Sequence, residues 1–175
     1  QRVRNPVLVA RKVMEETDHV MLTGEGAQRF ARVMGFPDYD PVTPERRADW
    51  FDKRNRIDEV LGARALKMRR FLKEHPEYAG GTVGAAAVDA SGVLAAATST
   101  GGVTLKMVGR VGDSPVPGAG NYACACVAAS ATGTGEYVLR SLATRAIAER
   151  VEQGAGLDEA VAAVLARLGA DYDAD

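Results

Sequence analysis

Residues 80–102, Gly-Gly-Thr-Val-Gly-Ala-Ala-Ala-Val-Asp-Ala-Ser-Gly-Val-Leu-Ala-Ala-Ala-Thr-Ser-Thr-Gly-Gly, contain the pattern that decides the fold. Two runs of small residues, 82–89 and 93–98, predict short strands, and the intervening Ala-Ser-Gly predicts a turn. Small side chains on both faces suit a sheet that other layers cover closely. A hairpin also returns the chain to its starting point, so Thr82 and Thr100 are expected side by side.

The same stretch offers a hydroxyl nucleophile without a side-chain base, because it contains no histidine or cysteine. Thr82 follows two glycines, which suggests that its own α-amine serves as the base once the chain is cleaved after Gly81. An α-amine has a pKa of about 7.7–8.0 and is therefore partly unprotonated near neutral pH. The simpler alternative for this feature alone is a strand-start threonine after a glycine turn.

Length and charge exclude several classes of protein. The chain has 175 residues, enough for one domain with a buried core, and its net charge is −1. That balance gives no electrostatic reason to expect nucleic acid or an anionic membrane as a partner. No run approaches the roughly 18 apolar residues of a membrane span, and no signal peptide is visible, so a cytoplasmic location is expected.

Charged residues are unevenly distributed. They crowd residues 38–79, and this composition predicts a flexible linker with transient helix over residues 36–81; an ordinary surface helix is the alternative. Between residues 81 and 135 charged residues are few, and the region is expected to be buried, so each charge there needs a reason. These charged residues are Asp89, Lys106, Arg110 and Asp113.

Periodicity and end signals predict the remaining elements. Asn5-Pro6 marks a helix start, since asparagine caps helices and proline favours their first position. Helices are predicted over residues 6–16, 24–34, 134–151 and 157–168, the last ending at Gly169, and further strands over residues 19–22 and 120–130. Strands between helical layers suggest an α/β four-layer sandwich.

The two cysteines, Cys124 and Cys126, are too few for a disulfide scaffold. One intervening residue makes a mutual bridge strained. The sequence shows no further ligands beside them, so they are expected to be reduced packing cysteines, and neither a metal site nor a cofactor is predicted.

Four blocks together resemble the N-terminal-nucleophile amidohydrolases of the plant-type asparaginase, isoaspartyl peptidase and glycosylasparaginase family. Their order and spacing match the family, so the signal is far more specific than one glycine-rich loop. The blocks are Gly81-Thr82-Val83-Gly84, Thr98-Ser99-Thr100-Gly101-Gly102, Gly109-Arg110-Val111-Gly112-Asp113-Ser114-Pro115 and Thr132-Gly133-Thr134-Gly135-Glu136.

The resemblance implies roles for site residues. Thr100 would orient the nucleophile Thr82, and Arg110 and Asp113 would hold the α-carboxylate and α-amine of an aspartyl group, a pairing that suits their charges. A buried salt bridge without a ligand is the alternative for this pair. Thr132 and Gly133 would donate hydrogen bonds to the oxyanion. A phosphate-binding loop is the rival interpretation of Gly133-Thr134-Gly135, but the lysine that follows the glycines in such loops is absent here.

The resemblance also implies the architecture: an αββα sandwich of the N-terminal-nucleophile hydrolase type, incomplete at both ends, because the chain looks like an internal fragment of a precursor. Residues 1–175 would form one domain, with α-subunit helices over 1–35, the linker over 36–81 and the start of the β-subunit over 82–175. The cleaved halves would pair as an αβ heterodimer and then as (αβ)2.

The substrate implied is a small molecule, L-asparagine or a β-aspartyl dipeptide. Gly81 before the nucleophile favours this choice, whereas Gly35-Phe36 and Trp50 resemble the glycosylasparaginases, which cleave glycosylated asparagine. An inactive or unprocessed family member acting as an assembly subunit is a further alternative.

Overall fold

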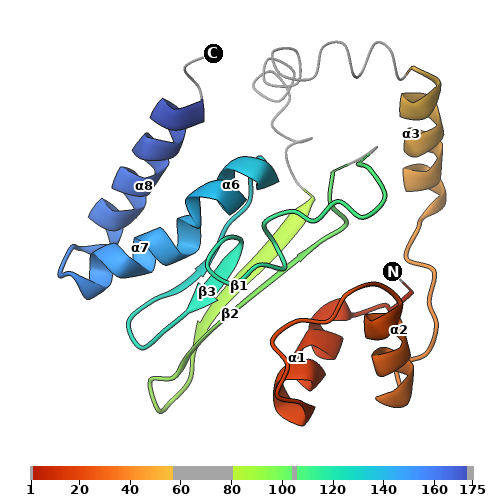
Figure 1. The fold of residues 1–175 in the computed structure, drawn as a ribbon, viewed down its shortest axis with the longest axis horizontal. Helices are drawn as coiled ribbons and strands as arrows, with labels where there is room; N and C mark the ends of the chain where they lie inside the picture. The colour runs from red at the N-terminus through yellow and green to blue at the C-terminus, as the bar shows by residue number, and fades with distance from the viewer. Residues whose placement is uncertain (1, 57–80, 104–105, 173–175) are drawn as a thin grey trace. The chain divides into compact units, whose positions relative to one another are not determined.

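The computed structural model describes residues 2–56, 81–103 and 106–172. Figure 1 traces their path. The chain divides into two compact units, one formed by residues 1–80 with 103–107 and the other by residues 81–102 with 108–175.

The first unit contains three described helices, α1 (Pro6–Glu16), α2 (Gly24–Val33) and α3 (Pro44–Asn55). The prediction for α1 is confirmed at both ends, and α1 buries Val9 and Val13, which lie one turn apart on the same face. The predicted end of α2 is also correct to within one residue.

Residues 19–22 do not form the predicted strand. A strand requires a partner for its backbone groups, and none of the strand pairs in the described ranges involves this segment. Val20 is strongly exposed instead. Helix α3 lies within the predicted linker and buries none of its residues. Residues 57–80 of the predicted linker lie outside the described part of the chain, so the linker stays a prediction.

The second unit begins with the predicted hairpin, whose strands are β1 (Thr82–Val88) and β2 (Leu94–Thr100). They pair antiparallel in full register, with Thr82 opposite Thr100. The Asp89 carboxylate closes the turn by accepting the backbone N–H groups of Ser91 and Val93, at 2.8 and 2.9 Å. Gly92 follows with φ +82°, a conformation that glycine adopts without a steric penalty. The hairpin prediction is therefore confirmed.

A second hairpin replaces the single strand predicted over residues 120–130. Its strands are β3 (Asn121–Ala123) and β4 (Ala128–Ser130). The intervening residues turn back, and the backbone N–H of Cys124 donates to the Val127 carbonyl at 2.9 Å. Small apolar residues continue through this turn, so the sequence pattern does not mark it.

The two hairpins pack against each other through side chains. The Thr98 hydroxyl donates to the Gly120 carbonyl at 2.9 Å and lies 2.6 Å from the Ser130 hydroxyl. Among the residues that the structure describes, backbone hydrogen bonds join strands only within each hairpin, so these are two separate sheets. The contacts between them are those of sheets lying face to face.

Helices α6 (Gly135–Ser141), α7 (Ala143–Glu152) and α8 (Leu157–Tyr172) follow the second hairpin. Figure 1 shows α7 beside β3, with β1 and β2 beyond it, and α7 contacts both β3 and β4. Within this unit the order is therefore helices, then β3–β4, then β1–β2.

Two helix boundaries differ from the predictions. The helix predicted over residues 134–151 is divided at Leu142, which takes the left-handed conformation with φ 47° and ψ 51°. This break allows the first N–H groups of α7 to donate to the preceding loop, including Arg145 N–H to the Gly118 carbonyl at 2.9 Å. The predicted stop at Gly169 is also wrong, because α8 continues to Tyr172.

The core of the second unit lies among the helices. Val138, Ala143 and Val164 are buried together, with partly buried Ala131, Ala146, Ile147 and Leu168 around them. Strand β1 is not closely covered by other layers as predicted, because Val83 and Val88 are 69% and 64% exposed. The buried cluster is thus built from α6, α7 and α8, whereas every residue of β1 after Thr82 is exposed. Helices and strands together make this an α/β protein.

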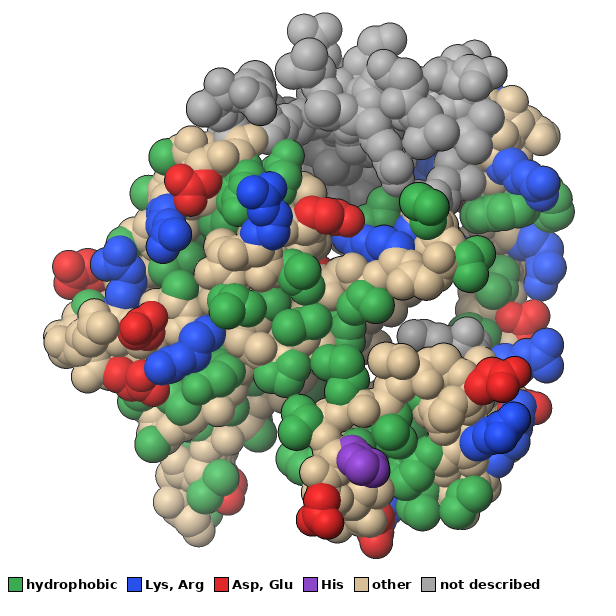
Figure 2. All heavy atoms as spheres, viewed as in Figure 1, with side chains coloured by type: hydrophobic (Ala, Val, Ile, Leu, Met, Phe, Trp, Pro, Cys, Tyr) green, Lys and Arg blue, Asp and Glu red, His purple; other side chains and the backbone are tan. Residues whose placement is uncertain are grey.

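The surface carries both signs of charge. On the face shown in Figure 2, Lys, Arg, Asp and Glu side chains are interspersed over the part of the molecule that contains the helices of the second unit. Among the residues that the structure describes, no helix is both long and apolar enough to cross a bilayer.

Candidate active site

Thr82 and Thr100 lie at the open end of the first hairpin, as the sequence predicts. Direct pairing in the β1–β2 register places the two residues opposite each other. The Thr82 hydroxyl donates a hydrogen bond to the Thr100 hydroxyl, with 3.2 Å between the oxygens, and both groups are partly buried. The predicted proximity is therefore confirmed.

The Thr100 hydroxyl has two further partners. It donates to the Gly81 carbonyl oxygen at 3.2 Å and accepts the Gly102 backbone N–H at 2.9 Å. Its single proton is thus directed at the Gly81 carbonyl, while its lone pairs accept the hydrogen bonds from the Thr82 hydroxyl and the Gly102 N–H. One hydroxyl consequently contacts the Thr82 hydroxyl and the carbonyl group of the Gly81–Thr82 peptide bond.

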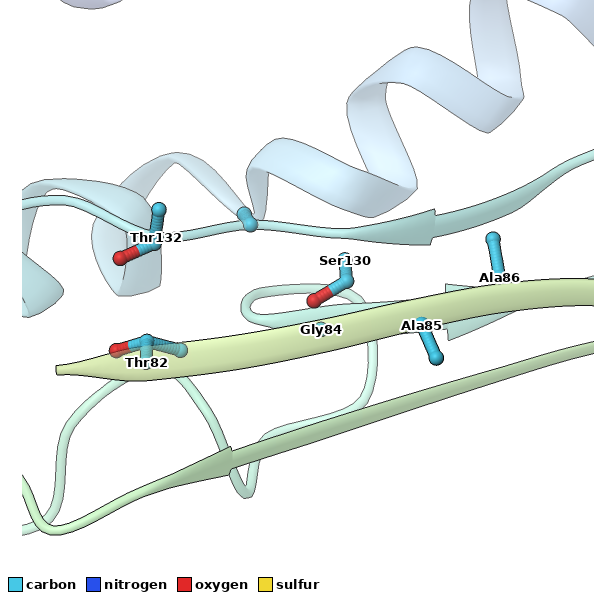
Figure 3. Close-up of a pocket in the computed structure, with 7 residues that line it drawn as sticks. Thr82, Gly84, Ala85, Ala86, Ser130 and Thr132 are labelled. Carbon is cyan, nitrogen blue, oxygen red and sulfur yellow. The ribbon is translucent and has the colours of Figure 1, made fainter. Parts of the chain in front are cut away.

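A solvent-open pocket lies beside Thr82 (Figure 3). Its lining residues are Thr82, Gly84, Ala85, Ala86, Ser130, Ala131 and Thr132. Figure 3 shows the hydroxyl oxygens of Thr82 and Thr132 directed toward the same end of this pocket. Strand β1 and the segment from Ser130 to Thr132 thereby bring together hydroxyl groups that are far apart in the sequence.

The close approach of β1 and β4 depends on Gly84. A Cβ atom at this position would overlap the Ser130 side chain. Sequence reasoning did not single out Ser130, whose hydroxyl bonds Thr98 across the two sheets. Its position at the end of a run of small residues gave no signal of this contact.

Thr132 and Gly133 are exposed in the loop between β4 and α6. Thr132 lies in the same pocket as Thr82, so the predicted oxyanion donor and the predicted nucleophile share a site. Gly133 directly follows Thr132 but is not among the lining residues.

Arg110 and Asp113 do not line that pocket and instead meet at Gly135. A Cβ atom on Gly135 would lie 2.7 Å from Arg110 Nη2 and 2.8 Å from Asp113 Oδ1. Gly135 is the first residue of α6 and follows Thr132 by three positions. The absence of a side chain at Gly135 therefore allows the guanidinium and the carboxylate to approach the same segment.

The Asp113 side chain is buried, with 7% of the residue exposed, and its Oδ2 atom has no hydrogen-bond partner among the residues that the structure describes. The backbone of Asp113 is anchored within the loop, because its carbonyl accepts backbone N–H groups from Val116 and Gly120 at 2.9 and 3.1 Å. A buried carboxylate oxygen without a partner carries a desolvation cost that a cationic ligand would offset.

Arg110 is paired with a residue that sequence reasoning left without a role. Its Nε and Nη2 atoms donate to Glu136 Oε1 at 2.9 and 2.8 Å. The Arg110 side chain is 18% exposed and that of Glu136 is 58% exposed. The salt bridge of Arg110 is therefore with Glu136, and not with Asp113 as in the alternative given for the sequence. The presence of Glu136 at the end of the fourth sequence block was the signal that could have indicated its role.

Comparisons with known proteins place the chain in a family. The asparaginase family model matches residues 1–175. A plant-type L-asparaginase of Pyrococcus abyssi is 50% identical over 152 residues, which is 87% of this chain and 50% of the relative. A plant-type L-asparaginase of Pyrococcus furiosus is 48% identical over 171 residues, covering 97% of this chain and 55% of the relative.

An isoaspartyl peptidase of Escherichia coli is 48% identical over 159 residues, covering 87% of this chain and 47% of the relative. The chain thus spans about half the length of the curated relatives that it matches. With the family model extending over residues 1–175 and these identities near one half, the chain belongs to the asparaginase family.

Proposed function

We propose that this chain carries the nucleophile of a self-cleaving threonine amidohydrolase that hydrolyses the side-chain amide of L-asparagine and β-aspartyl dipeptides. The observation that carries the proposal is the hydroxyl of Thr100, which contacts both the Thr82 hydroxyl and the Gly81 carbonyl. The names of the relatives, L-asparaginase and isoaspartyl peptidase, support the substrate class.

Self-cleavage comes first in this proposal. The Thr82 hydroxyl oxygen attacks the Gly81 carbonyl carbon, and the Gly81–Thr82 C–N bond breaks as an ester forms and the Thr82 amine takes up the hydroxyl proton. Thr100 assists because its proton points at the Gly81 carbonyl oxygen, where negative charge develops. Water then hydrolyses the ester, which leaves a Gly81 carboxylate and a free Thr82 α-amine.

Amide hydrolysis follows the same chemistry on an external substrate. The free α-amine of Thr82 accepts the hydroxyl proton as the oxygen attacks the substrate's side-chain amide carbon. Thr132, in the same pocket, and the neighbouring Gly133 N–H stabilise the oxyanion. Ammonia or an amine leaves with a proton, and water hydrolyses the β-aspartyl ester to release aspartate and restore Thr82.

Arg110 and Asp113 recognise the substrate's amino-acid group in this scheme. The buried Asp113 carboxylate, with its unpartnered Oδ2, suits an α-ammonium group. Arg110 suits the α-carboxylate, and its Nη1 atom is not used in the pair with Glu136. Because the two groups meet at Gly135, the amino-acid group would lie next to the segment that follows Thr132 and Gly133.

The finer architecture belongs to the same proposal. Two β layers and one helical layer within the second unit support an αββα sandwich. Residues 1–35 and 82–175 would belong to the two cleaved halves of one domain, with residues 36–81 as the linker. Pairing of the halves into (αβ)2 and a cytoplasmic location remain predictions.

Mass spectrometry of the intact protein and assays on three substrates test the proposal. We expect two fragments divided between Gly81 and Thr82, and turnover of L-asparagine and of a β-aspartyl dipeptide. Thr82→Ala should abolish both cleavage and turnover, and Thr82→Ser, which keeps a hydroxyl, should retain some of each. Thr23→Ala, the same change at an exposed residue of the first unit, is the control.

The outcomes separate the alternatives. Turnover restricted to a glycosylated asparagine would replace the proposed substrate by that of a glycosylasparaginase. A single uncleaved species without turnover would instead indicate an unprocessed assembly subunit. Full activity of Thr82→Ala would reject Thr82 as the nucleophile.

A further inference from the structure

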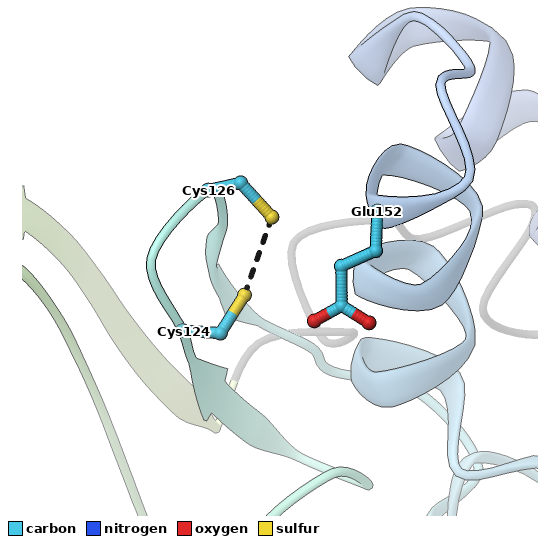
Figure 4. Close-up of side chains that lie close together, drawn as sticks. All are labelled: Cys124, Cys126 and Glu152. Atoms are coloured by element: carbon cyan, nitrogen blue, oxygen red, sulfur yellow. Dashed lines mark hydrogen bonds between the residues drawn. The ribbon is translucent and has the colours of Figure 1, made fainter.

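The turn between β3 and β4 carries two thiols in contact. Cys124 and Cys126 flank a single alanine, and their Sγ atoms lie 3.5 Å apart (Figure 4). Cys126 is exposed and Cys124 is only partly buried, so the expectation of packing cysteines is wrong. Neither thiol forms a disulfide. The tight turn holds both sulfur atoms on the same side of the hairpin.

A carboxylate from another element completes the cluster. Glu152 is the last residue of α7, and one of its oxygens lies within 4.8 Å of both sulfur atoms. Figure 4 shows the carboxylate extending from the helix toward the two sulfur atoms. Since α7 packs on both β3 and β4, the scaffold fixes the distance between the helix end and the turn. Sequence reasoning missed Glu152 because 26 positions separate it from Cys126 in the chain.

We propose that Cys124, Cys126 and Glu152 form a binding site for a thiophilic divalent cation such as Zn²⁺. Thiolate and carboxylate oxygen are both established zinc ligands. The proposal concerns a second site, separate from the residues assigned to amide hydrolysis, and stands independently of that activity.

The ligand distances suit tetrahedral coordination. With Zn–S near 2.3 Å and Zn–O near 2.0–2.2 Å, a tetrahedron places its two sulfurs about 3.8 Å apart and each sulfur about 3.6 Å from the oxygen. The observed Sγ–Sγ distance of 3.5 Å is already close to this value. Each oxygen–sulfur separation lies within 4.8 Å, so a small change in side-chain torsions would close the site.

Arg145 supports the carboxylate from the side. Its Nη1 atom donates to Glu152 Oε2 at 2.8 Å, and its guanidinium lies over the Tyr122 ring, 5.5 Å from the centroid. A carboxylate has two oxygens, so this ion pair is compatible with one oxygen binding a cation. Partners of this kind orient metal ligands, and their loss commonly weakens metal binding.

Charge balance also favours a divalent ion. Binding would convert two thiols to thiolates with release of two protons, and the two thiolates with one carboxylate carry three negative charges. A divalent cation and the Arg145 guanidinium together neutralise these charges. Three protein ligands fill three tetrahedral positions, and a water molecule would occupy the fourth.

Titration of the reduced, metal-free protein with Zn²⁺, and separately with Co²⁺, tests the proposal. We expect one ion per chain by calorimetry, and with Co²⁺ the absorption of a tetrahedral site together with a sulfur-to-cobalt charge-transfer band. The double variant Cys124→Ser, Cys126→Ser should lose the band and the binding. Glu152→Gln should weaken binding by about tenfold or more while preserving the charge-transfer band.

Glu149→Gln is the matched control, because Glu149 is an exposed residue of the same helix outside the cluster. It should bind Zn²⁺ like the parent protein. Equal effects of Glu152→Gln and Glu149→Gln would overturn the three-ligand site. So would Zn²⁺ binding that survives loss of both thiols, or one ion shared between two chains. Circular dichroism of each variant checks that the fold is intact.

Discussion

The Thr82 hydroxyl donates to the Thr100 hydroxyl at 3.2 Å, and that same Thr100 hydroxyl donates to the carbonyl oxygen of Gly81. The three groups form a directed chain of hydrogen bonds from the proposed nucleophile to the carbonyl that it would attack. Such an arrangement increases the polarity of the carbonyl bond. The β1–β2 register maintains it, because Thr82 and Thr100 are paired directly.

Replacing Thr100 by alanine should slow cleavage of the Gly81–Thr82 bond by about 100-fold, since removal of one such donor costs roughly this much in other hydrolytic sites. Thr100→Ser keeps the hydroxyl and should cleave at a rate much closer to the parent protein. The fraction of uncleaved chain, followed by mass spectrometry after synthesis, measures the rate.

Ser99→Ala provides the control for Thr100→Ala. Ser99 is the neighbouring residue of β2, and strand geometry places its side chain on the opposite face. It should cleave normally. If Thr100→Ala cleaved as fast as Ser99→Ala, the hydrogen-bond chain would have no part in the reaction.

Gly135→Ala should weaken substrate binding more than it slows the chemical step. The new Cβ would lie 2.7 Å from Arg110 Nη2 and 2.8 Å from Asp113 Oδ1, so both side chains would have to move. Displacing groups that hold the amino-acid part of the substrate raises KM. Steady-state kinetics on L-asparagine should show a KM increase of about tenfold with a smaller change in kcat.

Gly26→Ala is the corresponding control within a helix. Gly26 lies inside α2, and no atom of the described ranges 2–56, 81–103 and 106–172 is within 4 Å of the position that its Cβ would occupy. This change should stabilise the protein by about 0.5–1 kcal/mol through helix propensity alone and leave KM unchanged. A Gly135→Ala protein with parental KM would contradict the proposed role of the Arg110 and Asp113 pair.

Asp113→Asn should raise KM while leaving the free protein as stable or more stable. Within the described part of the chain the Asp113 Oδ2 atom is buried without a partner, and an amide in place of the carboxylate relieves a desolvation cost of about 1 kcal/mol or more. For a chain of this size each kcal/mol shifts Tm by about 2–4 °C. The substrate ammonium would lose its counter-charge at the same time, with an expected rise in KM of at least about tenfold.

Calorimetric Tm and KM measured on one Asp113→Asn preparation separate the two effects. The exposed Asp171→Asn serves as a control and should change neither quantity appreciably. A strong fall in Tm for Asp113→Asn would indicate that the carboxylate has a structural role instead of the binding role.

The local elements were predictable from the sequence where short-range chemistry determines them. Asn5-Pro6 marked the start of α1, and the small-residue hairpin with its turn after Asp89 was correct. The division of a helix at Leu142 was not predictable, because a left-handed leucine is intrinsically unfavourable. The tertiary hydrogen bonds from α7 to the loop before β3 accompany that conformation, and no local pattern records them.

The same distinction applies to the candidate site. Thr82 and Thr100 could be paired from the sequence because a hairpin relates them by a simple register. Ser130, Glu136 and Glu152 could not be placed, because their partners come from other elements through packing of two sheets and a helix. Contacts that depend on layer packing have no fixed sequence spacing.

The reactivity of Cys126 provides a pH-dependent prediction. The pKa of the Cys126 thiol is raised above its ordinary value, first by the hydrogen bond with Cys124, then by burial, and then by the negative charges of Cys124 and Glu152. A raised pKa means less thiolate at a given pH, so alkylation by iodoacetamide should be slower near neutral pH than for an ordinary exposed cysteine. Cys124→Ala removes the largest cause of the raised pKa and should move the alkylation-rate profile of Cys126 to lower pH.

Peptide mass spectrometry over a pH series measures this profile, and Glu149→Gln is the control in which it should not shift. An unchanged profile in Cys124→Ala would show that the two thiols do not interact.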